Sequence, residues 1–270
     1  MLKDITLGQY YPGNSVVHRI DPRMKIILTA VYVVMLFIIT HPVGLTVGLL
    51  VLVVGYGASK IPPRLMLKGL KPVLPIILFT AVLNIFFVDG EVLYRIWMIK
   101  ITKEGLLLAA VMAVRILCLI AGTSLLTYTT SPIVLTDGLE RLMAPLKVIK
   151  LPVHELAMMM TIALRFIPTL IEETDKIMSA QKARGADMET GGLVKRAKAL
   201  IPILIPLFVS AFRRADELAL AMECRCYRGG EGRTRMKQLK FSSADAYSLA
   251  FFVLCLAAVV AINLTLPSVV

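Results

Sequence analysis

The stretch Met24–Ser59, MKIILTAVYVVMLFIITHPVGLTVGLLVLVVGYGAS, decides the fold class of this chain. It is almost unbroken apolar sequence. As a single helix it would be roughly 50 Å long, whereas the hydrocarbon core of a bilayer is about 30 Å thick. His41 and Pro42 interrupt the stretch near its middle. Split there, it predicts two short membrane-spanning helices, at 24–40 and 43–59, joined by a turn.

The charges that flank this hairpin predict its orientation. Both flanks are basic, whereas the turn contains no Lys or Arg. Because positively charged segments stay in the cytoplasm, we expect both flanks to be cytoplasmic and the turn to be external. The basic residues are Arg19, Arg23 and Lys25 on one side, and Lys60, Arg64, Lys68 and Lys71 on the other.

The composition of the whole chain supports a membrane protein. Of its 270 residues 57% are hydrophobic, and the mean hydropathy is +0.78. A soluble domain is closer to half apolar, so the balance indicates an integral membrane protein. Three further spans are predicted, at 71–88, 105–128 and 246–266. The N-terminal membrane region is therefore 1–130, with four spans, and the last span lies in 245–270.

The segment 131–244 differs from the rest, because it holds eighteen of the thirty Lys and Arg residues. Two apolar stretches inside it, Leu156–Ile171 and Leu200–Phe212, resemble spans. If both crossed the membrane, the loop between them would be external while carrying six basic residues, which violates the positive-inside rule. We therefore predict a cytoplasmic domain of about three amphipathic helices between the fourth and fifth spans. The fold expected is all-α, with the N-terminus cytoplasmic and the C-terminus external.

Two of these cytoplasmic helices are predicted to end in the same way. SAQKARGAD (Ser179–Asp187) and AMECRCYRGG (Ala221–Gly230) each place an arginine in the last turn of a helix, beside small residues. A cation there complements the helix dipole, which is the simpler interpretation. Alternatively, Arg184 and Arg225 are planar donors that insert into acidic grooves of a cytosolic partner.

These two signatures resemble those of a known family. AQKARGAD and AMECRCYRGGEGRTR are similar to the two Ala-Arg-Gly signatures of the transmembrane T component of energy-coupling factor transporters, which are ABC-type importers. HRIDPRMKI, before the first span, also resembles the opening of that family. The likeness extends over essentially the whole chain. Cys226 stands where the family usually has Gly, which raises the question of whether that turn keeps the same cap.

The resemblance implies a non-catalytic subunit of an ATP-driven complex in a bacterial-type plasma membrane. Its partners would be two cytosolic ABC-type ATPases, which bind ATP and Mg²⁺, a membrane-embedded S component that binds the substrate, and the lipid bilayer, but no nucleic acid. No cofactor is expected in this chain. The residues implied in ATPase coupling are Arg184 and Arg225, with Ala183, Gly185, Cys224 and Cys226 as their neighbours.

Methionines on the same helices are candidates for docking the S component, because Met side chains form adaptable surfaces. Plain core packing is the alternative interpretation. The candidates are Met158, Met159, Met160 and Met178. The substrates implied are vitamins or other micronutrients.

Arg115 lies near the middle of the fourth span, where an unpaired charge is costly. We expect it to bond Asn84, backbone carbonyls or a group of the S component.

Other functions are weighed against the coupling subunit. A T component dedicated to cobalt or nickel uptake is one alternative. An integral membrane enzyme is another, but the three histidines are far apart and no pair of acidic residues has catalytic spacing. The chain has no P-loop motif, so we do not expect it to hydrolyse ATP. Cys224 and Cys226 form a C-x-C without a second cysteine pair or a nearby His, so no metal site is predicted.

Overall fold

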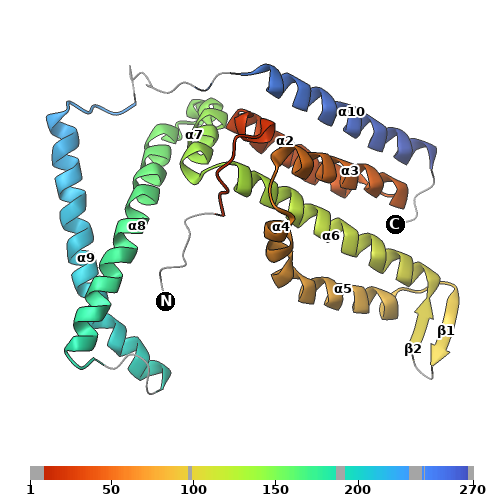
Figure 1. Ribbon diagram of the computed structural model, residues 1–270, viewed down its shortest axis with the longest axis horizontal. Coiled ribbons are helices and arrows are strands. Elements are labelled where there is room, and N and C mark those ends of the chain that lie inside the picture. The colour runs from red at the N-terminus through yellow and green to blue at the C-terminus, as the bar shows by residue number, and fades with distance from the viewer. Residues whose placement is uncertain (1–8, 97–98, 187–191, 231–238, 240, 267–270) are drawn as a thin grey trace. The chain divides into compact units, whose positions relative to one another are not determined.

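The structure is a computed structural model that describes residues 9–96, 99–186, 192–230, 239 and 241–266 (Figure 1). The predicted positions of both chain termini, at 1–8 and 267–270, lie outside the described residues. The chain divides into two compact units. Residues 8–138 with 238–270 form the bundle unit, and residues 1–7 with 139–237 form the crossed-helix unit. Each is described by itself.

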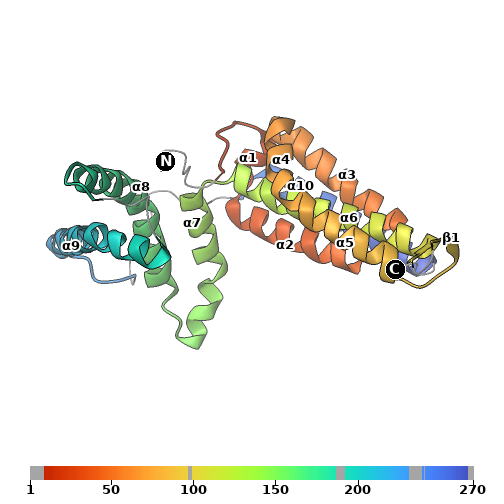
Figure 2. The same cartoon turned by 90° about the horizontal axis from the view of Figure 1, so that it is seen from below.

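Helices make up most of the bundle unit. Its elements are α1 (Val16–Arg19), α2 (Pro22–Ile38), α3 (Pro42–Ser59), α4 (Pro63–Leu70), the 3₁₀ turn η1 (Lys71–Val73), α5 (Leu74–Phe87), strands β1 (Val92–Ile96) and β2 (Ile99–Thr102), α6 (Lys103–Thr129), the greater part of α7 (Pro132–Leu142), and α10 (Ser243–Thr265). Helices α2, α3, α5 and α6 run side by side in both views (Figures 1 and 2).

The hairpin predicted at His41–Pro42 is confirmed as α2 and α3. The side chain of Asp21 accepts a hydrogen bond from the Arg23 amide at 2.9 Å and so caps the start of α2. His41 caps α3 by accepting from the Val43 amide at 3.2 Å. Proline at the first position of each helix suits the fixed φ angle of that residue.

The later predicted helices are also present, with different bounds. The predicted span 71–88 overlaps a longer helical segment, Pro63–Phe87, and those at 105–128 and 246–266 correspond to α6 and α10. Where a loop was expected before α6, β1 and β2 pair as an antiparallel hairpin. The sequence of this hairpin is rich in β-branched and aromatic residues, which favour strands.

Five described helical segments are long and apolar enough to cross a membrane: α3, Pro63–Phe87, α6, α8 (Val153–Ala183) and α10. The predicted number is also five, but the two sets differ by one member each. Helix α2 has only 17 residues, whereas α8 qualifies through the apolar part of its 31 residues. The placement of α8 in a cytoplasmic domain stays a prediction.

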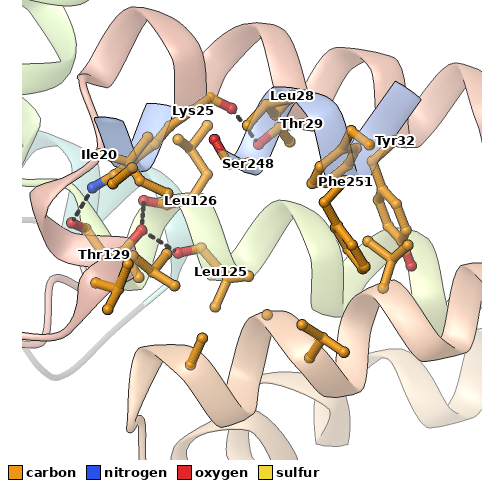
Figure 3. A pocket seen from close by; sticks show the side chains of 18 of the residues that line it. Ile20, Lys25, Leu28, Thr29, Tyr32, Leu125, Leu126, Thr129, Ser248 and Phe251 are labelled. Atoms are coloured by element: carbon orange, nitrogen blue, oxygen red, sulfur yellow. Dashed lines mark hydrogen bonds between the residues drawn. The ribbon is translucent and has the colours of Figure 1, made fainter. Parts of the chain in front are cut away.

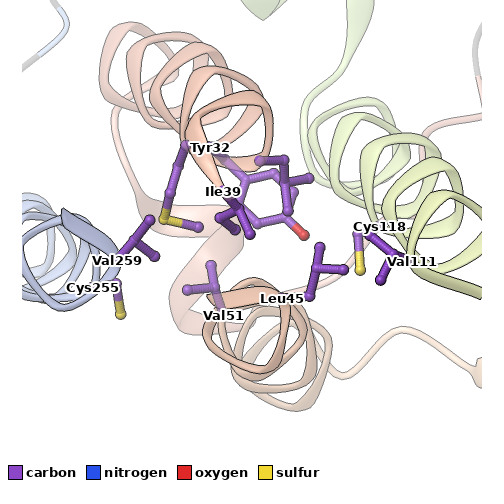
Figure 4. Close-up of a cluster of buried hydrophobic side chains, with 10 residues drawn as sticks. Tyr32, Ile39, Leu45, Val51, Val111, Cys118, Cys255 and Val259 are labelled. Atoms are coloured by element: carbon purple, nitrogen blue, oxygen red, sulfur yellow. The ribbon is translucent and has the colours of Figure 1, made fainter. Parts of the chain in front are cut away.

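The core of the bundle unit forms where α2, α3, α6 and α10 meet (Figure 4). Met35, Leu36 and Val259 have no exposed surface, and Ile39 has 1%. The hydroxyl of Tyr32 lies within this core and donates to the Gly48 carbonyl at 3.2 Å. Burial of these side chains holds the four helices together.

A buried polar tie joins the start of α2 to the start of α10. The Asp245 carboxylate accepts from the Asp21 amide at 2.8 Å and from the Ser242 amide at 2.6 Å. Arg23 forms two hydrogen bonds to the Asp21 carboxylate, at 3.0 and 2.9 Å, and its guanidinium lies 4.3 Å from the centre of the Phe241 ring. The sequence HRIDPR thus anchors the N-terminal segment to the last helix.

Arg115 also has a partner of the kind predicted. Its Nη2 donates to the Ile39 carbonyl, at the end of α2, over 2.6 Å. Asn263 of α10 donates to the neighbouring Ile38 carbonyl at 2.7 Å. The last carbonyls of a helix lack partners within it, so two side chains from other helices satisfy them here. Arg115 therefore satisfies a carbonyl at the end of α2, whereas its Nε is buried without a hydrogen-bond partner among the described residues.

The crossed-helix unit contains the end of α7, the 3₁₀ turn η2 (Ala144–Ile149), α8 and α9 (Leu193–Cys224). The two long helices predicted from the sequence are confirmed as α8 and α9. They run antiparallel and cross (Figure 1). Pro168 lies inside α8, and Pro202 and Pro206 lie inside α9.

Candidate functional site

Helix α8 ends on Arg184 in a hydrogen-bonded cap. Gly185 adopts a φ of +85°, the left-handed conformation that glycine allows without strain. Its amide donates to the Lys182 carbonyl at 3.0 Å, and the Ala186 amide donates to the Gln181 carbonyl at 3.0 Å. These two bonds form a Schellman motif, with Arg184 as the last residue before the turn. The glycine that follows Arg184 in the sequence is the residue type most common at such a cap, and the structure places it there.

Helix α9 ends in the same motif without a glycine. Cys226 has a φ of +55°, and its amide donates to the Glu223 carbonyl at 2.8 Å. The Tyr227 amide donates to the Met222 carbonyl at 3.0 Å. The turn therefore keeps the same cap although cysteine replaces glycine. Arg225 occupies the position that Arg184 has on α8.

Both arginines face outward from these caps. Arg184 and Arg225 are exposed, and neither makes a side-chain hydrogen bond or ion pair with the residues that the structure describes. Ala183, Cys224 and Cys226, which flank them, are exposed as well. Each helix end thus presents one planar guanidinium with five donors among small side chains, a geometry that suits a carboxylate.

Polar contacts between the two helices fix their crossing. Glu173 of α8 accepts hydrogen bonds from Ser210 and from Arg214, the latter at 2.9 Å. Gln181 donates to the Pro202 carbonyl at 3.3 Å. Because the helices are antiparallel, Arg184 lies close to this crossing. The end of α9 extends about 16 Å beyond Arg214, so Arg225 lies toward the opposite end of the pair.

A second contact holds the segment after Arg225. Gly230 lies against the ring of His154 at the start of α8, where an added Cβ would be only 2.6 Å from the ring. Nδ1 of His154 is 3.1 Å from Oε1 of Glu140 on α7. This contact was not predicted, because a glycine after the end of a helix does not reveal a partner 76 residues away.

The predicted methionines lie on α8 but are not equally accessible. Met159 and Met160 are 54% and 43% exposed, whereas Met158 and Met178 are partly buried. Helix α9 carries a second apolar surface, which is not among the predicted docking residues. Its exposed residues recur at helical spacing, at Ile201, Ile205, Phe208 and Phe212. Among the described residues, no group of three or more His, Cys, Asp or Glu could hold a metal ion.

Known proteins resemble this chain over nearly its full length. A family model, CbiQ, described as a cobalt transport protein, matches residues 13–236. This chain belongs to the CbiQ family. A relative from Ruminiclostridium cellulolyticum, named energy-coupling factor transporter transmembrane protein EcfT, is 57% identical over 245 residues, which cover 91% of this chain and 92% of the relative.

Two more relatives carry the same name. The protein from Acidaminococcus fermentans is 56% identical over 260 residues, covering 94% of this chain and 96% of its own length. The protein from Lactococcus lactis is 46% identical over 246 residues, covering 91% and 92%. The predicted resemblance to the transmembrane component of energy-coupling factor transporters is confirmed. With its five candidate spans and these relatives, this CbiQ-family chain is a multi-pass protein of the cell membrane.

The cap of α9 leads to a first prediction for this CbiQ-family chain. A non-glycine residue with left-handed φ costs about 1–2 kcal/mol, partly offset by the greater flexibility of glycine when unfolded. Replacing Cys226→Gly should therefore slow hydrogen exchange of the Tyr227 amide about fivefold, and Gly185→Cys should accelerate exchange of the Ala186 amide similarly. Cys224→Ala, which leaves φ unchanged, is the control. Faster exchange in Cys226→Gly would contradict the strain at this cap.

Proposed function

We propose that this chain is the transmembrane coupling subunit of an energy-coupling factor ABC importer. It transmits the ATP-driven movement of two cytosolic ATPases to a membrane S component that carries the substrate. The observation that supports this role most directly is the pair of exposed arginines, each on a helix end with the same hydrogen-bonded cap. ATP and Mg²⁺ are bound by the ATPases, and this chain holds no cofactor of its own.

The caps give the arginines a mechanical use. A Schellman motif ties the residue after the helix back to the last turn, so the orientation of the guanidinium follows the helix axis. Arg184 and Arg225 each insert into an acidic groove of one ATPase and form a two-pronged hydrogen bond with a carboxylate. When an ATPase moves, it therefore displaces the whole stiff helix, whereas an arginine on a flexible loop would transmit little of the movement.

The contacts inside the crossed-helix unit make α8 and α9 move together. Glu173 links to Ser210 and Arg214, and Gln181 links to α9 near Pro202. A force applied at one arginine is therefore passed to both helices. Coupling between distant sites needs such a mechanically linked element.

The S component docks on the exposed apolar side chains of these same helices. Met159 and Met160 supply adaptable contacts on α8, with Met158 and Met178 at the margin. A surface of this kind accepts several partners, which favours vitamins or other micronutrients as the substrates. A subunit dedicated to cobalt or nickel is the second candidate, and the description of the matching family model favours it. It predicts one kind of S component bound to this chain in native membranes, rather than several.

The two native cysteines beside Arg225 test this placement. In the proposed orientation the N-terminus and the segment 131–244 are cytoplasmic and the C-terminus is external. Cys224 and Cys226 are exposed, whereas Cys118 and Cys255 are buried. A membrane-impermeant maleimide should therefore label the chain in inverted vesicles stripped of ATPases, and rebinding the ATPases should protect it. Intact cells should show no labelling of the native chain.

A matched variant controls for access from outside. Thr265 lies at the exposed end of α10, so Thr265→Cys should be labelled in intact cells. Labelling of Cys224 or Cys226 in intact cells, or the absence of protection by bound ATPases, would refute the placement.

A further inference from the structure

The bundle unit contains a cavity of about 430 Å³ that the proposed coupling role does not use (Figure 3). Residues of five helices line it: α1, α2, α3, α6 and α10. Its wall is largely aliphatic and aromatic, and includes Leu28, Val51, Leu125, Leu126 and Phe251.

The polar side chains in this wall that are buried or half-buried are already bonded within the protein, whereas Ser243 and Tyr247 are exposed. Lys25 Nζ donates to the Thr129 carbonyl at 2.9 Å and to the Thr130 hydroxyl at 3.2 Å. Three hydroxyls likewise donate to carbonyls of the protein: Thr29 to Lys25 at 2.8 Å, Ser248 to Asp245 at 2.9 Å, and Tyr32 to Gly48 at 3.2 Å. A cavity whose polar groups are satisfied internally suits an apolar occupant better than water.

The cavity opens sideways between α1, α3 and α10. Residues of its wall on these three helices are exposed, namely Val16 at 62%, Val54 at 46% and Tyr247 at 77%. In a multi-pass membrane protein an apolar side opening faces lipid chains, with the aromatic ring of Tyr247 at its edge.

The shape of the cavity suits a lipid chain. Along α10 the wall extends from Ser243 to Phe252, about 13 Å. An extended hydrocarbon chain is long and narrow and has no polar groups that need partners, so it matches an elongated apolar wall.

Cations lie where the head of such a lipid would be. Arg19 is the last residue of α1, and Lys60 follows the end of α3. Both are exposed, and neither makes an ion pair or a side-chain hydrogen bond with the residues that the structure describes. Ile20 and Ala58, which belong to the cavity wall, are one and two residues away from them. This mouth is therefore positively charged.

We propose that the cavity is a binding site for an anionic phospholipid. One acyl chain enters between α3 and α10, and the phosphate lies beside Arg19 and Lys60. In the orientation proposed above, the lipid belongs to the cytoplasmic leaflet. The bound chain fills the gap between α3 and α10, and the headgroup links α1 to α3.

Native mass spectrometry of the full chain tests this site, with equal amounts of phosphatidylglycerol and phosphatidylcholine added to the detergent. We expect one retained phosphatidylglycerol for each chain. Ala58→Phe places a ring in the mouth and should remove it, whereas Val53→Phe should not, because Val53 is 60% exposed on the same helix and outside the cavity wall.

The headgroup is tested separately. Arg19→Gln and Lys60→Gln should each lower the preference for phosphatidylglycerol over phosphatidylcholine about fivefold, because a basic residue near an anionic surface contributes about 1 kcal/mol. Neither substitution should remove the binding of the acyl chain. Lys68→Gln, on α4, is the matched control.

Equal lipid retention by Ala58→Phe and Val53→Phe, or a preference that ignores both cations, would overturn the proposal. A cross-link from Tyr247→Cys to another subunit in native membranes would also overturn it, since a protein would then occupy the cavity. None of these measurements depends on transport, so the lipid site and the coupling role fail independently.

Discussion

Replacing Arg184→Ala and Arg225→Ala together is expected to abolish ATP-driven uptake while the chain remains folded in the membrane. Each arginine is exposed and each lies outside the hydrogen bonds of its cap, which are formed by backbone groups. Removing either arginine side chain should therefore change the free energy of unfolding of this chain little. In the proposed complex it would leave a carboxylate of an ATPase without its partner, and such a loss typically weakens binding by at least about thirtyfold.

The measurement is the amount of each ATPase that co-purifies with the tagged chain, together with uptake into vesicles. Each single variant should weaken one ATPase more than the other, because the two ends lie on different helices. Lysine should not restore binding fully, since it lacks the planar pair of donors. Arg213→Ala, an exposed arginine in the middle of α9, is the matched control and should behave like the native chain. A fully active complex from the double variant would disprove the coupling role of these arginines.

Most of the helices were predictable because they depend on local signals. Pro42 breaks the apolar stretch Met24–Ser59 at the point where α3 begins, and an ordinary bilayer thickness sets the length of each half. The class of fold and the existence of α8 and α9 follow from composition and charge in the same way. The strands β1 and β2 were missed because a short β-rich loop between spans resembles any interfacial loop.

The geometry of the site was predictable at Gly185 but open at Cys226. Glycine after a helix indicates a left-handed turn, whereas cysteine does not. The carbonyls that accept the capping bonds belong to the helix itself, at Met222 and Glu223, so the same motif forms even when its φ angle is strained. The roles of the two arginines in binding a partner rest on the resemblance, because exposure alone is equally typical of an ordinary helix-end cation.

Contacts between residues far apart in the sequence could not be predicted. Asp245 bonds Asp21 across 224 positions, and Arg115 bonds a backbone carbonyl that any neighbouring helix offers. Nothing in the local pattern distinguishes these partners from others. The cavity could not be predicted from the sequence either. It arises from the spacing between five helices, and each of its apolar residues taken alone resembles a core or lipid-facing residue.

The tie between Asp21 and Asp245 carries the largest expected effect on stability. Asp245 is only 3% exposed, and its carboxylate accepts two backbone amides, one of them the buried amide of Asp21. Asp245→Ala leaves that amide without a partner, which costs about 1–3 kcal/mol, and removes the capping box of α10, which costs about 1 kcal/mol more. The sum, about 3 kcal/mol, corresponds to a fall in the unfolding midpoint of about 6–12 °C for a domain of this size.

Thermal unfolding of the purified chain, followed by size-exclusion chromatography, measures this loss. Asp245→Asn keeps one acceptor oxygen and should lie between the native chain and Asp245→Ala. Asp216→Ala removes an exposed acid from α9 and should change the midpoint little, because surface substitutions rarely exceed about 0.5 kcal/mol. If Asp245→Ala and Asp216→Ala unfold at the same temperature, the hydrogen bonds of Asp245 do not stabilise the bundle unit. Apolar packing alone would then hold the start of α2 against the start of α10.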